Sequence, residues 1–180
     1  MMDINISHNG ASAVDYFKNG LSREGNYYQE DVPAYWEGET SKHKYLNLYG
    51  KEVTIENFHD LVHNINPNTK EQLTPLHKDD RRAGYDIGTA PPKSVSIVHA
   101  FTKDPELFNS HVYANRIMMQ AIEQDIQAQA NTQNGRFYET TGNMLWAPFH
   151  HFTSRPVEVK INEHTVYVPD MQMHTHKLLH

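Results

Sequence analysis

One long amphipathic helix constrains the fold of this 180-residue chain more than any other segment. Asp104 is a typical N-cap, and Pro105 suits the first helical turn, where its missing N–H is not needed. Apolar side chains then recur at helical spacing along one stripe, at Ala114, Ile117, Met118, Ala121 and Ile122. Because such a stripe has to be buried against another element, we predict that this helix packs on a sheet and contributes the stripe to the core.

The segments around this helix predict short strands and helices in an order typical of a mixed fold. Strands are expected at 2–7, at 84–89 and, after the helix ends between Asn131 and Gly135, at roughly 137–152 and 165–179. Shorter helices are expected at 12–18, 53–61 and 93–101, the last of them buried. We therefore predict one α+β domain over residues 1–180, with helices packed on a largely antiparallel sheet.

The composition restricts the compartment and the chemistry of any metal site. The chain has no cysteine, which rules out disulfides, thiolate metal ligands and a cysteine nucleophile. A bound metal would therefore use histidine, carboxylate or backbone oxygen ligands. No apolar run approaches the length of a membrane span and no apolar leader begins the chain, so we expect a soluble intracellular protein without membrane insertion.

Three of the thirteen histidines have a spacing that suits a shared metal ion. In a strand, successive side chains alternate faces, so His174 and His176 would project from one side while Thr175 points away. His151 lies in the preceding expected strand, which can pair beside them. Three histidines with open coordination positions would form a catalytic rather than a sealed structural site. The alternative is that these side chains, like His150, His164 and His180, are surface or packing histidines.

Four sequence blocks carry a resemblance to a known family. In order along the chain they are Tyr16-Phe17 with Tyr27-Tyr28, the segment 84–96 (GYDIGTAPPKSVS), the segment 140–155 with TTGN and HFTSR, and the segment 169–176 (PDMQMHTH). Together they resemble the N-terminal relaxase domain of TrwC/TraI-type (MobF) conjugative relaxases, within the histidine-hydrophobic-histidine (HUH) nucleases. The resemblance implies the palm-like fold of that domain, an antiparallel sheet covered by helices.

The resemblance also implies a tyrosine nucleophile. It places this role at Tyr16 and makes Tyr27 and Tyr28 candidates for a further strand transfer. The chain departs from the family pattern at Phe17, where a second tyrosine often stands, which leaves Tyr16 as the nucleophile of the first pair. The alternative for each tyrosine is an aromatic packing residue with its hydroxyl in water.

The remaining implied roles concern the metal and the DNA. The resemblance assigns His151, His174 and His176 to a divalent metal, Mg²⁺ or Mn²⁺, although the ligand types suit Zn²⁺ as well. Asp86 matches the acid that supports the metal histidines, with a turn residue as the alternative. Lys93 and Arg155 would contact DNA phosphates, with solvated charges as the alternative.

The implied function is DNA nicking and rejoining at a plasmid transfer origin, which initiates conjugative transfer. Its partners would be single-stranded DNA and relaxosome accessory proteins, in the bacterial cytoplasm. The formal net charge of −6 opposes DNA binding, so a local basic surface, for instance around the cluster His77-Lys78 and Arg81-Arg82, would have to provide it.

Two departures leave other functions open. Residues 156–169 are longer than the turn expected between the two histidine strands, which predicts an extended hairpin. The sequence also stops four residues after His176, as expected for a domain truncated at its C-terminal end. The alternatives are a catalytically inactive relaxase-like fragment that binds DNA or a relaxosome partner, and an unrelated histidine-metal enzyme such as a small oxygenase.

Overall fold

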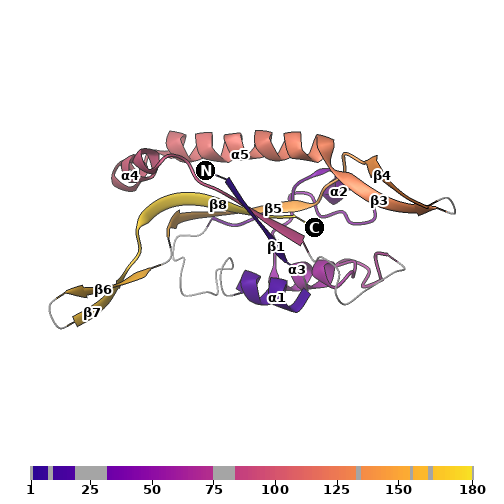
Figure 1. The fold of residues 1–180 in the computed structure, drawn as a ribbon, viewed down its shortest axis with the longest axis horizontal. Helices are drawn as coiled ribbons and strands as arrows, with labels where there is room; N and C mark the ends of the chain where they lie inside the picture. The colour runs from indigo at the N-terminus through magenta and orange to yellow at the C-terminus, as the bar shows by residue number, and fades with distance from the viewer. Residues whose placement is uncertain are drawn as a thin grey trace.

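A four-stranded antiparallel sheet forms the centre of the molecule (Figure 1). The computed structural model describes residues 2–7, 10–18, 32–74, 84–132, 135–154, 156–161 and 164–179. The strands follow the order β1 (Met2–Ser7), β2 (Gly84–Thr89), β8 (Met171–Leu179) and β5 (Trp146–Thr153). All three neighbouring pairs are antiparallel, so the predicted α+β class with its antiparallel sheet is confirmed.

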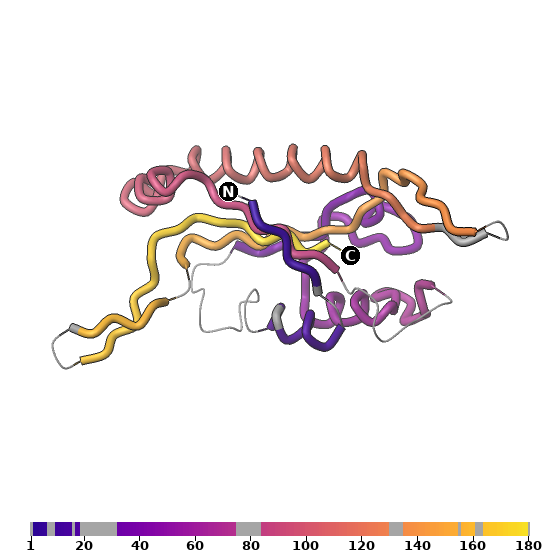
Figure 2. Tube along the Cα trace, in the orientation of Figure 1, coloured from indigo at the N-terminus to yellow at the C-terminus, as the bar shows by residue number. Residues whose placement is uncertain are grey.

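Helices lie on both sides of this sheet (Figures 1 and 2). One side carries α4 (Lys93–Thr102) and the long α5 (Pro105–Asp125). The other carries α1 (Gly10–Tyr16) and α3 (Ile55–Val62), and the short α2 (Glu39–Lys42) lies near the end of β5. None of the helices in the described ranges combines the length and the apolar character needed to span a bilayer.

Two hairpins extend from opposite ends of the sheet (Figure 1). One is formed by β3 (Gln127–Thr132) and β4 (Gly135–Thr140), the other by β6 (Val157–Ile161) and β7 (His164–Val168). The second is the extended hairpin predicted between the histidine strands. The first was not predicted: α5 ends at Asp125 rather than near 131, and one expected strand is split into β4 and β5 around Gly142, whose φ is +60°.

Each face of the sheet has its own hydrophobic core. The larger core lies on the α1 and α3 side, where the Phe17 ring stacks on Phe58 with centroids 4.6 Å apart. The smaller core lies under α5 and consists of Ile87, Met119, Met144, Trp146 and Leu179. Since the strands alternate their side chains between these two layers, each residue of β8 belongs to one face only.

The buried face of α5 differs from the prediction. Its buried residues are spaced four apart and mostly polar: His111, Asn115, Met119 and Glu123. In the predicted stripe, Ile117 is 48% exposed, whereas Met118 and Ile122 are half-buried and pack against the smaller core. The polar side chains can be buried because neighbouring elements supply hydrogen-bond partners. The Glu123 carboxylate, for example, accepts the backbone N–H groups of Glu39 and Met144 at 2.7 and 2.9 Å.

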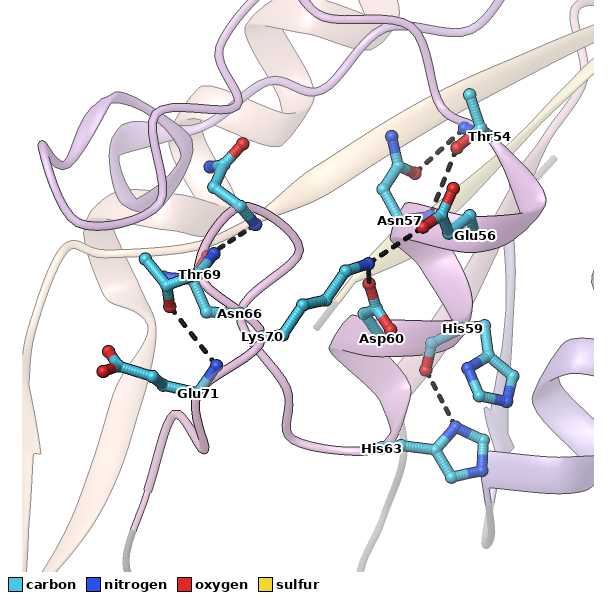
Figure 3. A network of polar contacts seen from close by, with 11 residues as sticks. Thr54, Glu56, Asn57, His59, Asp60, His63, Asn66, Thr69, Lys70 and Glu71 are labelled. Carbon is cyan, nitrogen blue, oxygen red and sulfur yellow. Dashed lines mark hydrogen bonds and ion pairs between the residues drawn. The ribbon is translucent and has the colours of Figure 1, made fainter.

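Polar contacts help to fix the positions of α4 and α3. Contrary to the prediction of a buried helix, α4 buries only Ser96 and His99 and leaves Phe101 76% exposed. Its Ser96 hydroxyl accepts the Met173 N–H of β8 at 3.0 Å. On α3, Thr54 forms a capping box, and Lys70 pairs with Glu56 and Asp60 at 2.9 and 2.6 Å (Figure 3).

Candidate metal centre

Three imidazole rings meet on the face of the sheet that carries α1 and α3. In the pairing of β5 with β8, His151 lies directly opposite His174, and Phe149 opposite His176. The ring centroids are 5.1 Å apart for His151 and His174, 5.2 Å for His174 and His176, and 5.8 Å for His151 and His176. The structure thus brings together the three histidines that the sequence singled out, as strand alternation requires.

Asp86 lies behind one of these rings. This buried carboxylate on β2 accepts a hydrogen bond from Nδ1 of His176, with oxygens at 2.8 and 3.1 Å. Because Nδ1 then carries the proton, the lone pair of that ring is on Nε2, on the side away from Asp86. A carboxylate in this position fixes the tautomer of a metal-binding histidine and raises its basicity.

His174 is held in the same tautomer by the backbone. Its Nδ1 lies 2.9 Å from the carbonyl oxygen of Gln172, which can only accept, so Nδ1 is the donor. Burial lowers the pKa of His174 to about 4, and the neighbouring His151 and His176 contribute to the lowering. The ring is therefore neutral near pH 7, and a neutral imidazole is the form that binds a metal.

The donor set fits a divalent metal in chemical type, but the rings do not yet converge. Three imidazoles without a thiolate leave open positions for water or phosphate oxygens, as catalytic sites do. Among the described residues, no three His, Asp or Glu side chains have donor atoms close enough together to hold a metal as they stand. Ring rotation would have to bring the nitrogens of His151, His174 and His176 onto one point. Their assignment as ligands stays a prediction.

The chain around Tyr16 is anchored beside these histidines. Tyr16 is the last residue of α1, and Phe17 directly follows it. The Phe17 ring is only 2% exposed and packs edge-on against Phe149 at 5.4 Å, and Phe149 is the cross-strand neighbour of His176. An apolar ring suits this position, where a buried tyrosine hydroxyl would need a hydrogen-bond partner. Tyr27 and Tyr28 lie outside the described residues.

Of the two cations predicted to contact DNA, the structure describes Lys93 but not Arg155. Lys93 forms an ion pair with the Asp170 carboxylate and donates to the Met171 carbonyl at 2.7 Å, which ties the start of α4 to the start of β8. Phosphate contact by Lys93 stays a prediction. Arg155 and the basic cluster around Arg81 lie outside the described residues.

Sequence reasoning missed a second group of polar residues, on the opposite face of β8. Thr175 is buried between two imidazoles, one from α5 and one from β5, and His150 is therefore not a surface histidine. Burial lowers the pKa of His111 to about 4 and that of His150 to about 3. The spacing of His111 and Asn115, four apart on a helix, was the available signal.

Solved structures of relaxases resemble this fold. The metal-bound structure of the conjugative relaxase TrwC in complex with oriT DNA superposes with a TM-score of 0.75 at 25% identity, covering 99% of this chain and 56% of that one. A copper-bound TrwC complex with oriT DNA gives 0.74 at 25% identity, with 99% and 57% covered. A metal-free complex gives 0.73 at 24% identity, with 99% and 55% covered.

Curated relatives agree with this likeness. The multifunctional conjugation protein TraI of Escherichia coli strain K12 is 26% identical over 167 residues, which span 92% of this chain but 9% of TraI. A second Escherichia coli TraI is 24% identical over 168 residues, again 92% of this chain and 9% of the relative. The family model for the TrwC relaxase matches residues 10–180. The chain therefore belongs to the TrwC relaxase family.

Proposed function

We propose that this chain is the tyrosine- and metal-bearing part of a conjugative relaxase, which nicks and rejoins one DNA strand at a plasmid transfer origin. The observation that carries the proposal is the cluster of His151, His174 and His176 with Asp86 behind it, on the face where the chain at Tyr16 is anchored. Family membership supports it, and leaves the unrelated oxygenase without support. The similar TrwC structures are described as complexes with oriT DNA, and two of them as metal-bound or copper-bound.

In this proposal the three histidines hold the divalent ion and Asp86 keeps one of them in the correct tautomer. His174 and His176 each donate through Nδ1, to Gln172 and Asp86 respectively, which leaves Nε2 of both rings as the ligand atom. A bound Mg²⁺ or Mn²⁺, or Zn²⁺, would polarise a non-bridging phosphate oxygen and stabilise its developing charge.

Tyr16 supplies the nucleophile. Its hydroxyl oxygen forms a bond to the phosphorus of the scissile phosphodiester, and the bond to the 3′-oxygen of the upstream nucleotide breaks. The phenol proton passes to water during attack and the departing 3′-oxygen takes up a proton from water, so the products are a 5′-phosphotyrosine and a 3′-hydroxyl. One phosphodiester replaces another at similar energy, which permits rejoining. Tyr27 and Tyr28 are candidates for a second transfer of the same kind.

The proposed partner is single-stranded DNA at the transfer origin. Lys93 and Arg155 would contact phosphates, and the acidic net charge requires that these contacts be local. Relaxosome accessory proteins and a place in the bacterial cytoplasm are expectations that follow from the same function. The chain spans 55–57% of the chains of the similar TrwC structures and 9% of TraI, and activities of those longer proteins that need other parts are outside the proposal.

The second candidate is a module that binds DNA or a relaxosome partner without cutting it. The observation that favours it is the separation of the histidine donor atoms, since no three of them in the described residues gather closely enough to hold a metal as they stand. The two candidates differ in whether a covalent protein–DNA bond forms.

The deciding experiment is a covalent-adduct assay. The chain is incubated with Mn²⁺ and labelled single-stranded oligonucleotides covering transfer-origin sequences, and adducts that survive denaturation are resolved on a gel. We expect an adduct with the wild type, none with Tyr16→Phe, and an unchanged adduct with Tyr113→Phe, a matched control at an exposed tyrosine on α5. Binding to these oligonucleotides without any adduct, in a folded metal-loaded chain, would support the non-cutting candidate.

A further inference from the structure

A buried hydroxyl connects two histidines on the face of the sheet opposite the candidate metal centre. The Thr175 side chain is 0% exposed, and its Oγ1 lies 2.8 Å from Nε2 of His111 and 2.8 Å from Nδ1 of His150. A hydroxyl can donate once and accept twice, so one Thr175 side chain can satisfy both neutral rings. These bonds join β8 to α5 on one side and to β5 on the other.

The hydrogen-bond network continues to the third strand through a buried lysine. Lys177, also 0% exposed, donates from Nζ to the Thr89 hydroxyl of β2, and Thr89 donates in turn to the side-chain oxygen of Asn115 on α5. The Asn115 amide donates to the backbone carbonyl of His111 at 2.7 Å. We call this set, from Thr89 to Lys177, the buried polar network; its members are Thr89, His111, Asn115, His150, Thr175 and Lys177.

The buried polar network spans the same three strands that carry the candidate metal centre. Thr175 lies directly opposite Thr89 on β2 and directly opposite His150 on β5. The metal-centre residues occupy the other face of these strands, with Asp86 on β2, His151 on β5, and His174 and His176 on β8. On β5 and β8 the two sets are chain neighbours: His150 precedes His151, and Thr175 and Lys177 flank His176.

A second metal site is not the explanation for this network. Nζ of Lys177 is hydrogen-bonded within it, and burial lowers the pKa of Lys177 to about 7, so below that pH its ammonium form would repel a divalent ion beside His111 and His150. The geometry instead suits a role in strand alignment, because hydrogen bonds to the single Thr175 hydroxyl hold this position of β8 against both β5 and α5.

We propose that Thr175 is a positioning residue for the metal centre: its hydroxyl fixes β8 against β5 and α5, and so sets the separation of His151, His174 and His176. The inference rests on the proposed function, because it needs a metal that these histidines share. Without the hydroxyl, the buried rings of His111 and His150 lose a partner, and a buried polar group without one is costly. β8 then has to shift or admit water, and either change moves the two histidines that flank Thr175.

The test compares metal affinity with fold stability in the full chain. Mn²⁺ binding is measured by isothermal titration calorimetry for wild type, Thr175→Val, which has the same shape without the hydroxyl, and Thr175→Ser, which keeps it. We expect Thr175→Val to weaken Mn²⁺ binding about tenfold or more, as loss of a residue that orients metal ligands typically does. Thr175→Ser keeps the hydroxyl, and its Mn²⁺ affinity should stay within about threefold of the wild type. Thermal unfolding of each metal-free variant is recorded alongside.

Met119→Ala is the matched control. Met119 is one turn beyond Asn115 on the same face of α5 and wholly buried, but it belongs to the smaller core rather than to the network. This variant should lower the unfolding temperature and leave Mn²⁺ affinity unchanged. Unchanged affinity in a folded Thr175→Val would overturn the positioning role.

Two further outcomes of this test can be told apart: a Thr175→Val chain that does not fold, and a wild type that binds no Mn²⁺. If Thr175→Val does not fold, Thr89→Val takes its place, because it removes the hydroxyl between Lys177 and Asn115 and is expected to weaken Mn²⁺ binding; wild-type affinity there would overturn the proposal. If the wild type itself binds no Mn²⁺, the metal-dependent function fails and the positioning role fails with it. Wild-type binding with an unaffected Thr175→Val would contradict the positioning role alone.

Discussion

At the scale of single residues, the candidate centre depends on which nitrogen of each ring carries a proton. The Asp86 carboxylate and the Gln172 carbonyl both accept from Nδ1, which leaves Nε2 of His176 and His174 as the nitrogens that could bind a metal. These contacts come from residues far apart in the sequence, or from the backbone. The sequence could indicate the three histidines and Asp86, but it could not indicate the tautomers.

Asp86→Ala should therefore weaken Mn²⁺ binding by about 10- to 100-fold, because His176 loses the group that fixes its proton on Nδ1. Asp86→Asn retains an acceptor oxygen and should fall between the wild type and Asp86→Ala. Calorimetric titration of all three chains measures this order. Equal affinities in the three would mean that Asp86 does not support a metal ligand.

The buried imidazole of His111 should make the fold sensitive to acid. Its pKa is lowered to about 4 by burial, whereas in the unfolded chain it is close to 6.5. Between these values the unfolded state binds more protons, so the free energy of unfolding decreases as the pH falls from about 6.5 to 4. The loss from this group is on the order of 3 kcal/mol when complete.

Urea denaturation at several pH values between 7 and 4.5 measures this loss. His111→Gln removes one of three buried histidines with a lowered pKa, the others being His150 and His174, and should make the dependence of unfolding free energy on pH less steep without abolishing it. His164→Gln, at an exposed position on β7, is the matched control and should keep the wild-type slope. A wild-type slope in His111→Gln would show that the acid sensitivity has another origin.

At the scale of elements, some strands and helices could be predicted from local sequence patterns, whereas others depend on tertiary contacts. The strands β1 and β2 were predicted within their observed bounds, because alternation and a closing proline pair are local signals, whereas the one strand expected at 165–179 is divided into β7 and β8. The hairpin of β3 and β4 was not predicted. In the β3 sequence QAQANT, Gln and Ala alternate, but no β-branched or aromatic residue precedes the last position, and the pairing with β4 determines its conformation. The buried face of α5 was misassigned because His111, Asn115 and Glu123 have partners that are distant in sequence and come together only in the folded chain.

The hairpin of β6 and β7 should be removable without loss of the metal centre. At its base the Ser154 N–H donates to the Asp170 carbonyl at 2.8 Å, and Thr153 pairs with Met171, so β5 and β8 are aligned before the hairpin begins. Replacing residues 157–168 by Asn-Gly should keep Mn²⁺ affinity within about twofold, as for independent sites. A larger loss in a folded variant would assign the hairpin a role in the centre.

At the scale of the whole molecule, the net charge of −6 means that the proposed DNA binding would have to rely on a few local cations. Lys93 is one candidate, and the Asp170 carboxylate neutralises it in the present structure. The number of lysines and arginines therefore does not give the DNA affinity, because a cation such as Lys93 can be paired with a carboxylate that is distant in the sequence.

Asp170→Asn should strengthen the binding of single-stranded DNA, since it leaves the Lys93 ammonium without its carboxylate. The slope of log affinity against log salt concentration should become steeper by about 0.7 if one additional phosphate is contacted. Fluorescence anisotropy across a salt series measures both effects, with Lys93→Ala/Asp170→Asn as the control that should abolish them. An unchanged slope would place Lys93 away from the DNA path.

The division of β8 into two faces has a consequence for how this protein can diverge. Odd positions such as Thr175 and Lys177 serve the buried polar network, while even positions carry the histidines. Inserting or deleting one residue within the strand would exchange the two sets and destroy both at once. Between the two histidine strands, length changes are therefore best tolerated in the β6–β7 hairpin, which makes that hairpin a natural place for lineages, or engineers, to add new sequence.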